Sequence, residues 1–364
     1  MTAHLRACLW LLVLTVLLCS VLYPLVLYGI AQTVFRNQAD GSLIADARGR
    51  LVGSGLIAQP FTADEYFQPR PSAISYNAAA SGASNWAASN YLLRDRVAQQ
   101  LGPIAKYRSG VKAGQLVGPD LERWFQKDRY ADKSGIVAQW AALHPTVAQN
   151  WVKADKLRGE YVAAWQKAHS QEVAQWVRDN PDTPEPKPED LAVPFFTSFS
   201  KDHPGMFPSA VVTRSVSKGP RTEDKVTRNV SEGPVAEHNT AEGKTTKQIE
   251  PVKAGAGIQA VFFDLWLQAH PDVDLAPVPA DMVMASGSGL DPDITLSNAL
   301  WQLDRVAAAW AKKTGRDQAT LHGEIEKLLR QKSFAPLAGL VGVPLVNVLE
   351  VNLALRERYG KARE

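Results

Sequence analysis

An apolar run near the N-terminus places the strongest constraint on how this chain can fold. Residues 7–30 are almost all apolar, with Thr15, Ser20 and Pro24 as the main interruptions. A helix of this length, rising about 1.5 Å per residue, is long enough to cross a hydrocarbon core about 30 Å thick. The sequence therefore predicts a transmembrane helix over residues 7–30, preceded by a short tail of residues 1–6.

A cleaved signal peptide is the alternative interpretation of this run. Residues 29–31 (Gly-Ile-Ala) loosely resemble a cleavage site, but the run exceeds the roughly 7–15 apolar residues of such a peptide. Its length favours a retained anchor. The flanking charges leave the orientation open, because Arg6 precedes the run and Arg36, Arg48 and Arg50 follow it.

Charge and cysteine content narrow the class of protein. The chain has 40 basic and 37 acidic residues, a net charge of +3. This balance lacks the excess of basic residues that is typical of nucleic-acid-binding proteins. Both cysteines, Cys8 and Cys19, lie inside the apolar run, about 16 Å apart on one helix, too far to bridge. A remainder without thiols fits an oxidising, exported compartment.

The remainder of the chain mixes short strands with helices. Gly-punctuated residues 38–59 predict short strands or turns, and alternation over residues 345–355 predicts a strand with a bulge. Asn347 and Asn352 interrupt this apolar stretch, so they must be hydrogen-bonded if buried. Apolar spacing predicts helices over residues 90–101, 296–311 and 321–329, the second capped by Asp291 or Thr295.

Residues 103–279 have a different character, with a recurring Trp-x-x-x-His/Asn-Pro unit. The unit predicts a helix that packs a Trp in its last turn and is stopped by Pro; the alternative is a Trp/His ligand site. Residues 214–256 contain no Phe, Trp, Tyr or Leu, which predicts a disordered or extended segment. The unit occurs at Trp140/His144/Pro145, Trp176/Asn180/Pro181 and Trp266/His270/Pro271.

Two segments rich in Gly, Ser, Asn and Pro, residues 54–90 and 285–292, predict ordered loops because the first of them also contains aromatic residues. Catalytic motifs for phosphate binding, zinc hydrolysis or a nucleophile elbow are absent from the sequence. An anchored serine enzyme of the penicillin-binding type is the alternative, on Ser109-Gly110-Val111-Lys112, Ser75-Tyr76-Asn77 and Lys313-Thr314-Gly315. Its motifs stand in the wrong order.

A set of longer motifs resembles the C subunit of the Kdp potassium-transporting ATPase, in family order, over roughly residues 7–102 and 280–355. The motifs are Tyr66-Phe67-x-x-Arg70-Pro71-Ser72-Ala73, Tyr76-Asn77, Ser81-Gly82-Ala83-Ser84-Asn85, Ala285-Ser286-Gly287-Ser288-Gly289-Leu290-Asp291-Pro292, Arg305-Val306-Ala307, Pro336 to Gly342, and Val346-Asn347-Val348-Leu349.

The resemblance implies the fold and the place of the chain. The implied fold is an α+β soluble domain, residues 31–102 and 280–358, on a single N-terminal transmembrane helix. Residues 103–213 and 257–279 would form a mainly helical insertion, with residues 214–256 disordered. It implies a single-pass protein of the bacterial inner membrane, with a cytoplasmic N-terminus and the bulk of the chain extracytoplasmic.

The resemblance also implies a non-catalytic subunit that assembles and stabilises a high-affinity ATP-driven potassium pump and raises its apparent ATP affinity. The implied partners are a channel-like potassium-binding subunit, a P-type ATP-hydrolysing subunit and a small single-span subunit. No catalytic, cofactor or metal residue is expected; ATP and K⁺ would act on the complex. The candidate partner-interface residues are Tyr66, Phe67, Arg70, Pro71, Ser72, Tyr76, Asn77, Ser81, Gly82, Ser84, Asn85, Ser286, Gly287, Ser288, Gly289 and Asp291.

Two alternatives remain open for these residues and their neighbours. The loop residues would equally well stabilise only their own domain, because interface loops and folding loops look alike in one sequence. A second hypothesis is that four carboxylates gather potassium near the membrane, namely Asp40, Asp46, Asp64 and Glu65.

Overall fold

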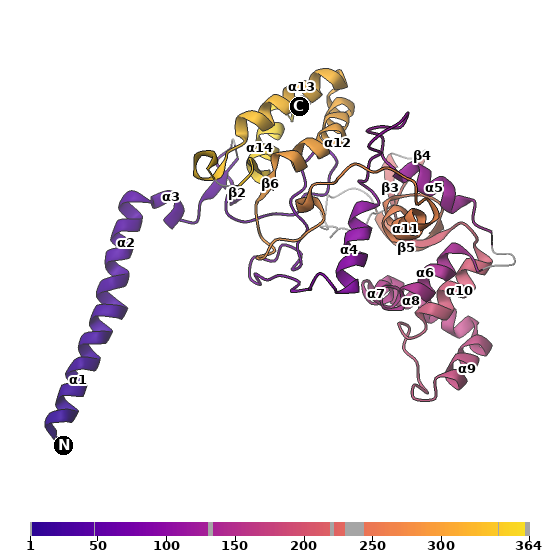
Figure 1. The fold of residues 1–364 in the computed structure, drawn as a ribbon, viewed down its shortest axis with the longest axis horizontal. Helices are drawn as coiled ribbons and strands as arrows, with labels where there is room; N and C mark the ends of the chain where they lie inside the picture. Colours follow the sequence, from indigo (N-terminus) through magenta and orange to yellow (C-terminus); the bar gives the residue numbers. More distant parts are fainter. Residues whose placement is uncertain are drawn as a thin grey trace. The chain divides into compact units, whose positions relative to one another are not determined.

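The fold is described from a computed structural model, which covers residues 2–46, 48–129, 134–218, 222–229, 244–340 and 342–360. The side chains of residues 3, 212–246, 337 and 338 lie outside this description. The chain divides into two compact units, residues 1–83 with 285–364 and residues 84–284. Figure 1 shows how the second unit is inserted into the sequence of the first.

The first unit begins with one long apolar helix, drawn in indigo in Figure 1. It runs through α1 (Thr2–Val16), a π-helical stretch (Leu17–Leu22) and α2 (Tyr23–Val34). Among the described residues, one helix is long and apolar enough to cross a membrane: His4–Val34, with 31 residues. Its most apolar stretch has a mean hydropathy of 2.5 and no buried residue. The predicted helix over residues 7–30 is confirmed as a helix and extends beyond both predicted ends.

The folded part of the first unit is a mixture of helices and two-stranded sheets, which agrees with the mixed α and β class. A short helix α3 (Arg36–Ala39) leads to the antiparallel pair β1 (Leu43–Ala45) and β2 (Leu51–Ser54). The later segments are β6 (Asp293–Thr295), α12 (Leu296–Thr314), α13 (Gln318–Lys332), a 3-10 turn (Pro336–Gly339), β7 (Leu345–Asn347) and α14 (Val348–Tyr359), with β6 antiparallel to β7. One core closes them, around the fully buried Trp310, Ile294 and Phe67.

The expected strand over residues 345–355 is wrong beyond Asn347. The chain leaves β7 there and enters α14, because the Asn347 side chain accepts the backbone N–H of Glu350 at 3.2 Å and caps the helix. Val348, Val351 and Leu355 are then buried at helical spacing. The break in the apolar alternation marks the point where the strand ends and the helix begins. In so short an apolar run, this change looks the same as a β-bulge.

The other predicted helices are confirmed. Residues 90–101 form α4 (Tyr91–Leu101), capped by Asn90, which accepts from the N–H of Leu92. Thr295, and not Asp291, caps α12 by accepting from the N–H of Asn298 at 3.1 Å. Residues 321–329 lie inside α13.

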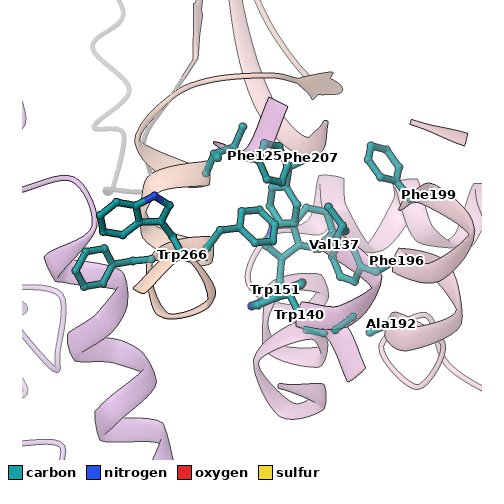
Figure 2. Packing of buried hydrophobic residues seen from close by; sticks show 14 of the residues in the cluster. Phe125, Val137, Trp140, Trp151, Ala192, Phe196, Phe199, Phe207 and Trp266 are labelled. Atoms are coloured by element: carbon teal, nitrogen blue, oxygen red, sulfur yellow. The ribbon is translucent and has the colours of Figure 1, made fainter. Parts of the chain in front are cut away.

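The second unit combines helices with a three-stranded antiparallel sheet in the order β4-β3-β5. Its core is aromatic (Figure 2): Trp140 meets Phe196 and Phe207 edge to face, at ring-centroid distances of 5.0 and 5.6 Å. Besides α4, its elements are α5 (Gly118–Gln126), α6 (Ile136–Leu143), α7 (Pro145–Lys153), α8 (Lys156–Ala168), α9 (Ser170–Asp179), α10 (Ala192–Asp202), β3 (Phe207–Lys218), β4 (Thr222–Asn229), β5 (Lys244–Val252), α11 (Ala256–Ala269) and a 3-10 turn (Ala280–Met282).

The Trp-x-x-x-His/Asn-Pro units end helices, as predicted. α6, α9 and α11 stop at His144, Asn180 and His270. Two of these side chains turn back to the Trp carbonyl one turn earlier: His270 Nδ1 lies 2.8 Å from Trp266 O, and Asn180 donates to Trp176 O at 2.8 Å. They therefore satisfy carbonyls left without a partner at the helix end. A similar helix end was missed in the sequence: α10 stops at His203, before Pro204, and the backbone N–H of His203 donates to Phe199 O at 2.8 Å.

The expected disorder over residues 214–256 is not what the structure shows where it describes this segment. Residues 214–218, 222–229 and 244–252 lie in β3, β4 and β5, because β3 pairs with both neighbours and so gives their backbone groups partners. The prediction for residues 219–221 and 230–243 lies outside the described residues. The second unit is thus helical with one added sheet.

Candidate functional site: two interlocked loops

The two Gly/Ser-rich loops of the first unit are joined by hydrogen bonds across more than two hundred residues. The Ser72 hydroxyl donates to Gly289 O at 2.7 Å, and Gly82 N–H donates to Ser288 O at 2.9 Å. A third bond, from Ala58 N–H to Leu290 O at 2.9 Å, extends the same contact. The predicted association of the two loops in one domain is therefore present for residues 58–82 with residues 286–291.

Ser72 organises the first loop. Its Oγ accepts the backbone N–H groups of Ile74 (3.3 Å) and Tyr76 (2.9 Å) while donating to Gly289 O. These bonds hold Ser75 and Tyr76 at left-handed φ angles of 53° and 58°, which residues other than glycine seldom adopt. The Tyr76 hydroxyl donates to Arg70 O at 2.8 Å, and burial raises the pKa of Tyr76 to about 12. The loop is thus locked by its own side chains.

Gly289 is the position in the second loop that requires glycine. Its φ is +68°, and a Cβ there would lie 2.7 Å from Ile74 Cγ1 and 2.8 Å from Gly82 O. Gly287 differs: its φ is not left-handed, it is exposed, and an added Cβ would meet no atom within 4 Å. One glycine therefore serves the packing of the loops, while the other leaves space at their surface.

Arg70 and Asp291 form an ion pair that also joins the loops. Arg70 Nη1 lies 3.1 Å from Asp291 Oδ2, and the two side chains are 27% and 33% exposed. Asp291 Oδ1 accepts the N–H of Asp293 at 3.1 Å, so the carboxylate is held at both oxygens. Arg70 was predicted to donate to a partner protein. In the structure its side chain is paired with Asp291 of its own domain.

Side-chain amides of α12 and α14 hold the backbone on which the first loop begins. Asn352 accepts from Phe67 N–H and donates to Phe67 O, both at 2.8 Å. Gln302 does the same for Gln68, at 2.8 and 3.0 Å. Arg305 donates to Asp64 O at 2.7 Å and to Tyr66 O at 3.1 Å. Asn352 is only 2% exposed, so the requirement that a buried Asn in this stretch be hydrogen-bonded is met.

The predicted interface residues fall into three groups. Phe67 is 1% exposed and Tyr66 packs edge to face on Trp310, so these two belong to the core of the unit and not to a surface. Ser84 and Asn85 lie beyond the boundary between the units. The remaining candidates make up the interlocked loops, with the exposed tips at Asn77, Ser81, Gly287 and Ser288.

The sequence reasoning missed Asn298 and Gln302. Both are buried on α12, and Gln302 Nε2 donates to Asn298 Oδ1 at 2.7 Å. Two amides spaced by four residues on the apolar face of a predicted helix were the available signal, since such groups must find partners when buried.

The two alternatives from the sequence find no support in these contacts. Ser109 donates to Asp274 and Lys112 to Asp120, so this lysine does not contact the serine it would activate, and Lys313-Thr314-Gly315 ends α12 where a strand is required. The four carboxylates of the potassium-gathering hypothesis each face a cation: Arg36 for Asp40, Arg50 for Asp46, Arg305 for Asp64 and Lys313 for Glu65. Within the described residues, no three His, Cys, Asp or Glu side chains are grouped to hold a metal.

Among the described residues, one helix long enough to span a membrane precedes a domain closed by two interlocked loops, which is the architecture of a protein with a single candidate membrane span. A family model for KdpC, the c chain of the K⁺-transporting ATPase, matches residues 5–121 and 252–357, more than half of the chain. The chain belongs to the KdpC family. It is by this membership an accessory subunit of the K⁺-transporting ATPase that is not catalytic by itself.

Individual relatives agree with this assignment. The potassium-transporting ATPase KdpC subunit of Pseudomonas syringae pv. tomato is 49% identical over 141 residues, which are 38% of this chain and 74% of the relative. The KdpC subunits of Pseudomonas putida and Geobacter sulfurreducens are each 54% identical, over 27% and 22% of this chain and 52% and 45% of their own lengths. The chain thus spans about three quarters of the first relative and about half of the other two.

The family match extends into the second unit. It includes α4, which the resemblance over residues 7–102 and 280–355 also covered, and α11, which that resemblance left out, and it omits residues 122–251. Aromatic residues of the omitted segment pack on Phe262 of α11, with ring centroids of Trp140 and Phe207 at 6.0 and 5.2 Å. The extra segment therefore builds its core on a helix that the family shares.

Proposed function

We propose that this chain is held in the bacterial inner membrane by the His4–Val34 helix, with its N-terminus in the cytoplasm and both units on the outer side. There it assembles and stabilises a high-affinity potassium pump beside a potassium-binding, channel-like subunit. A P-type subunit and a small single-span subunit complete the complex. Family membership and the one span-length helix support this placement.

ATP hydrolysis and potassium binding belong, in this proposal, to the partner subunits. A domain on the outer side cannot touch a cytoplasmic nucleotide. A raised apparent ATP affinity would therefore be a conformational coupling, in which this subunit favours the nucleotide-binding state of the complex.

We further propose that the interlocked loops are the docking surface. The single observation that carries this is their rigidity combined with exposure: Ser72, Gly289 and the Arg70–Asp291 pair fix both loops, yet the tips remain exposed. A surface fixed before binding loses little conformational freedom on association, which favours affinity. Loops that only stabilised their own domain would need the hydrogen bonds and the ion pair that fix them, but they would not need exposed tips made of small residues.

Gly287→Arg is expected to test this proposal without disturbing the fold, because a Cβ added at the exposed Gly287 would meet no atom within 4 Å. Gly323→Arg is the matched control: Gly323 is also exposed, in α13 of the same unit, and its added Cβ likewise meets nothing within 4 Å. Each variant carries an affinity tag and is co-expressed with the pump subunits. The complex is then purified in mild detergent.

The expected result is that Gly287→Arg loses the P-type and potassium-binding subunits from the purified complex, while Gly323→Arg retains them. Far-ultraviolet circular dichroism of both variants checks that they are folded. Equal recovery of the partners with both variants would remove the docking role from these loops and leave them a purely structural one.

A further inference from the structure

Exposed aliphatic side chains gather on the hairpin that follows the apolar helix. Leu43, Leu51 and Leu56 are 51%, 68% and 60% exposed. Leu43 pairs with Ser54 and Ala45 with Leu51, with a register shift between the two pairs, so Leu43, Ala45 and Leu51 share one face of the hairpin. Leu56 follows β2 in the chain. Ile44, on the other face of β1, is partly buried. The exposed face of a two-stranded hairpin is expected to be polar, and this one is not.

A second apolar segment adjoins the hairpin at its base. Phe334, Leu340 and Val343 are 46%, 86% and 54% exposed on either side of the 3-10 turn. The base of this loop is tied to the hairpin, because Asn347 Nδ2 donates to Gly55 O at 2.9 Å. The hairpin and this loop together form what we call the apolar rim.

The hairpin cannot lie far from the end of the apolar helix. Leu43 lies nine positions after Val34 in the chain, which limits their separation to about 30 Å at full extension. Part of that length is folded back: Asp40 N–H bonds to Arg36 O at 2.9 Å and Ser42 N–H to Asn37 O at 2.7 Å. The hairpin is therefore kept close to the point where the helix would leave a membrane.

The chemistry of the rim suits lipid better than a protein partner. Its exposed members are Leu, Val and Phe. The residues that contribute most of the binding energy in protein–protein interfaces are Trp, Tyr and Arg, whereas Leu and Val are under-represented among them. Two arginines lie near the hairpin in the sequence: the side chains of Arg36 and Arg50 are 80% and 62% exposed, and they pair with Asp40 and Asp46. Apolar side chains flanked by basic ones are typical of segments that rest in the headgroup region.

We infer that the apolar rim rests in the outer headgroup region of the membrane and so fixes the height and tilt of the first unit above it. This inference builds on the proposed function, since it takes the His4–Val34 helix as the span. The rim and the interlocked loops would then have separate tasks: one contacts lipid and the other the partner subunits.

The test uses the cysteines of the chain. Both natural ones, Cys8 and Cys19, are exposed on the apolar helix, so replacing them with Ala yields a cysteine-free chain. Single cysteines are then placed by Leu51→Cys and Leu340→Cys, with Val111→Cys, 101% exposed in the second unit, as the negative control. Native Cys19, in a Cys8→Ala chain, reports on the span itself. Each full-length chain is labelled with a nitrobenzoxadiazole dye and reconstituted in phosphatidylethanolamine–phosphatidylglycerol vesicles that contain spin-labelled lipid.

Quenching by the spin-labelled lipid at positions 19, 51 and 340, with position 111 quenched only by aqueous iodide, is the expected result. Quenching at position 19 but not at 51 would overturn the lipid contact while leaving the membrane anchor intact. No lipid quenching at position 19 would overturn the anchor and the contact together. Quenching at 51 without 340 would remove the loop from the rim. If position 51 became shielded only in the reconstituted pump complex, the occupant would be a protein and the inference would be wrong.

Discussion

Removing the Asn352 side chain should destabilise the base of the first loop more than any exposed substitution nearby. In the folded chain this amide is the partner of both backbone groups of Phe67. Asn352→Ala leaves a buried N–H and a buried C=O without partners, and each costs about 1–3 kcal/mol. The expected loss is therefore about 2–6 kcal/mol for opening of this region.

Hydrogen exchange measures that loss where it occurs. The peptide around Phe67 should exchange at least about 30-fold faster in Asn352→Ala, since about 1.4 kcal/mol corresponds to a factor of ten. Asn77→Ala is the control: Asn77 is exposed and its side-chain Oδ1 accepts from Ala79 N–H at 3.0 Å, so the change should stay within about 0.5 kcal/mol.

A conservative variant separates the hydrogen bonds from the volume of the side chain. Asn352→Asp keeps an acceptor for Phe67 N–H but, when ionised, has no donor for Phe67 O. A buried carboxyl has a raised pKa, so exchange in this variant should approach the wild-type rate near pH 4 and become faster than wild type as the pH rises and the carboxyl ionises. Exchange around Phe67 less than about threefold faster in Asn352→Ala would refute the account of this amide as a required partner.

Three further predictions follow from individual contacts. Gly289→Ala should cost about 2–4 kcal/mol in urea unfolding, because it adds left-handed strain to a close contact, whereas Gly323→Ala should gain about 0.5–1 kcal/mol as an exposed helix position. The side chain of Arg50 donates to Asp46 and holds the pKa of that carboxyl at about 2, below its ordinary 3.8; the stability it contributes is present above about pH 4 and lost as the pH falls towards 2. Arg50→Ala should return that pKa towards 4 in a carboxyl-carbon NMR titration, and an unchanged value would contradict the pairing. His270→Ala should lower the melting temperature by removing the bond to Trp266 O, worth about 0.5–1.5 kcal/mol, while His270→Asn, which copies Asn180, should restore most of it.

Local patterns predicted those elements whose evidence lies within one stretch of chain. The helices α4, α12 and α13 and the helix ends at His144, Asn180 and His270 were predicted because capping and apolar spacing act over a few residues. The structure of the stretch after Leu345 was not predicted correctly. A strand of three residues that passes directly into a helix is too short to show the two-residue period of a strand before the helical period begins. The strands within residues 207–252 were missed because their pairing, not their composition, gives them partners.

The sequence by itself determined the long apolar helix, the helix ends and the family. The length of an apolar run, the capping residues and the order of motifs can all be recognised without knowing which distant residues are in contact. It could not determine whether its Gly/Ser segments form linkers, folding loops or a surface. Only the tertiary structure decided this, because the partners of Ser72 and Arg70 lie 217 and 221 residues away. Hydrogen bonds between such distant residues exist only once the core around Trp310 has brought both segments together.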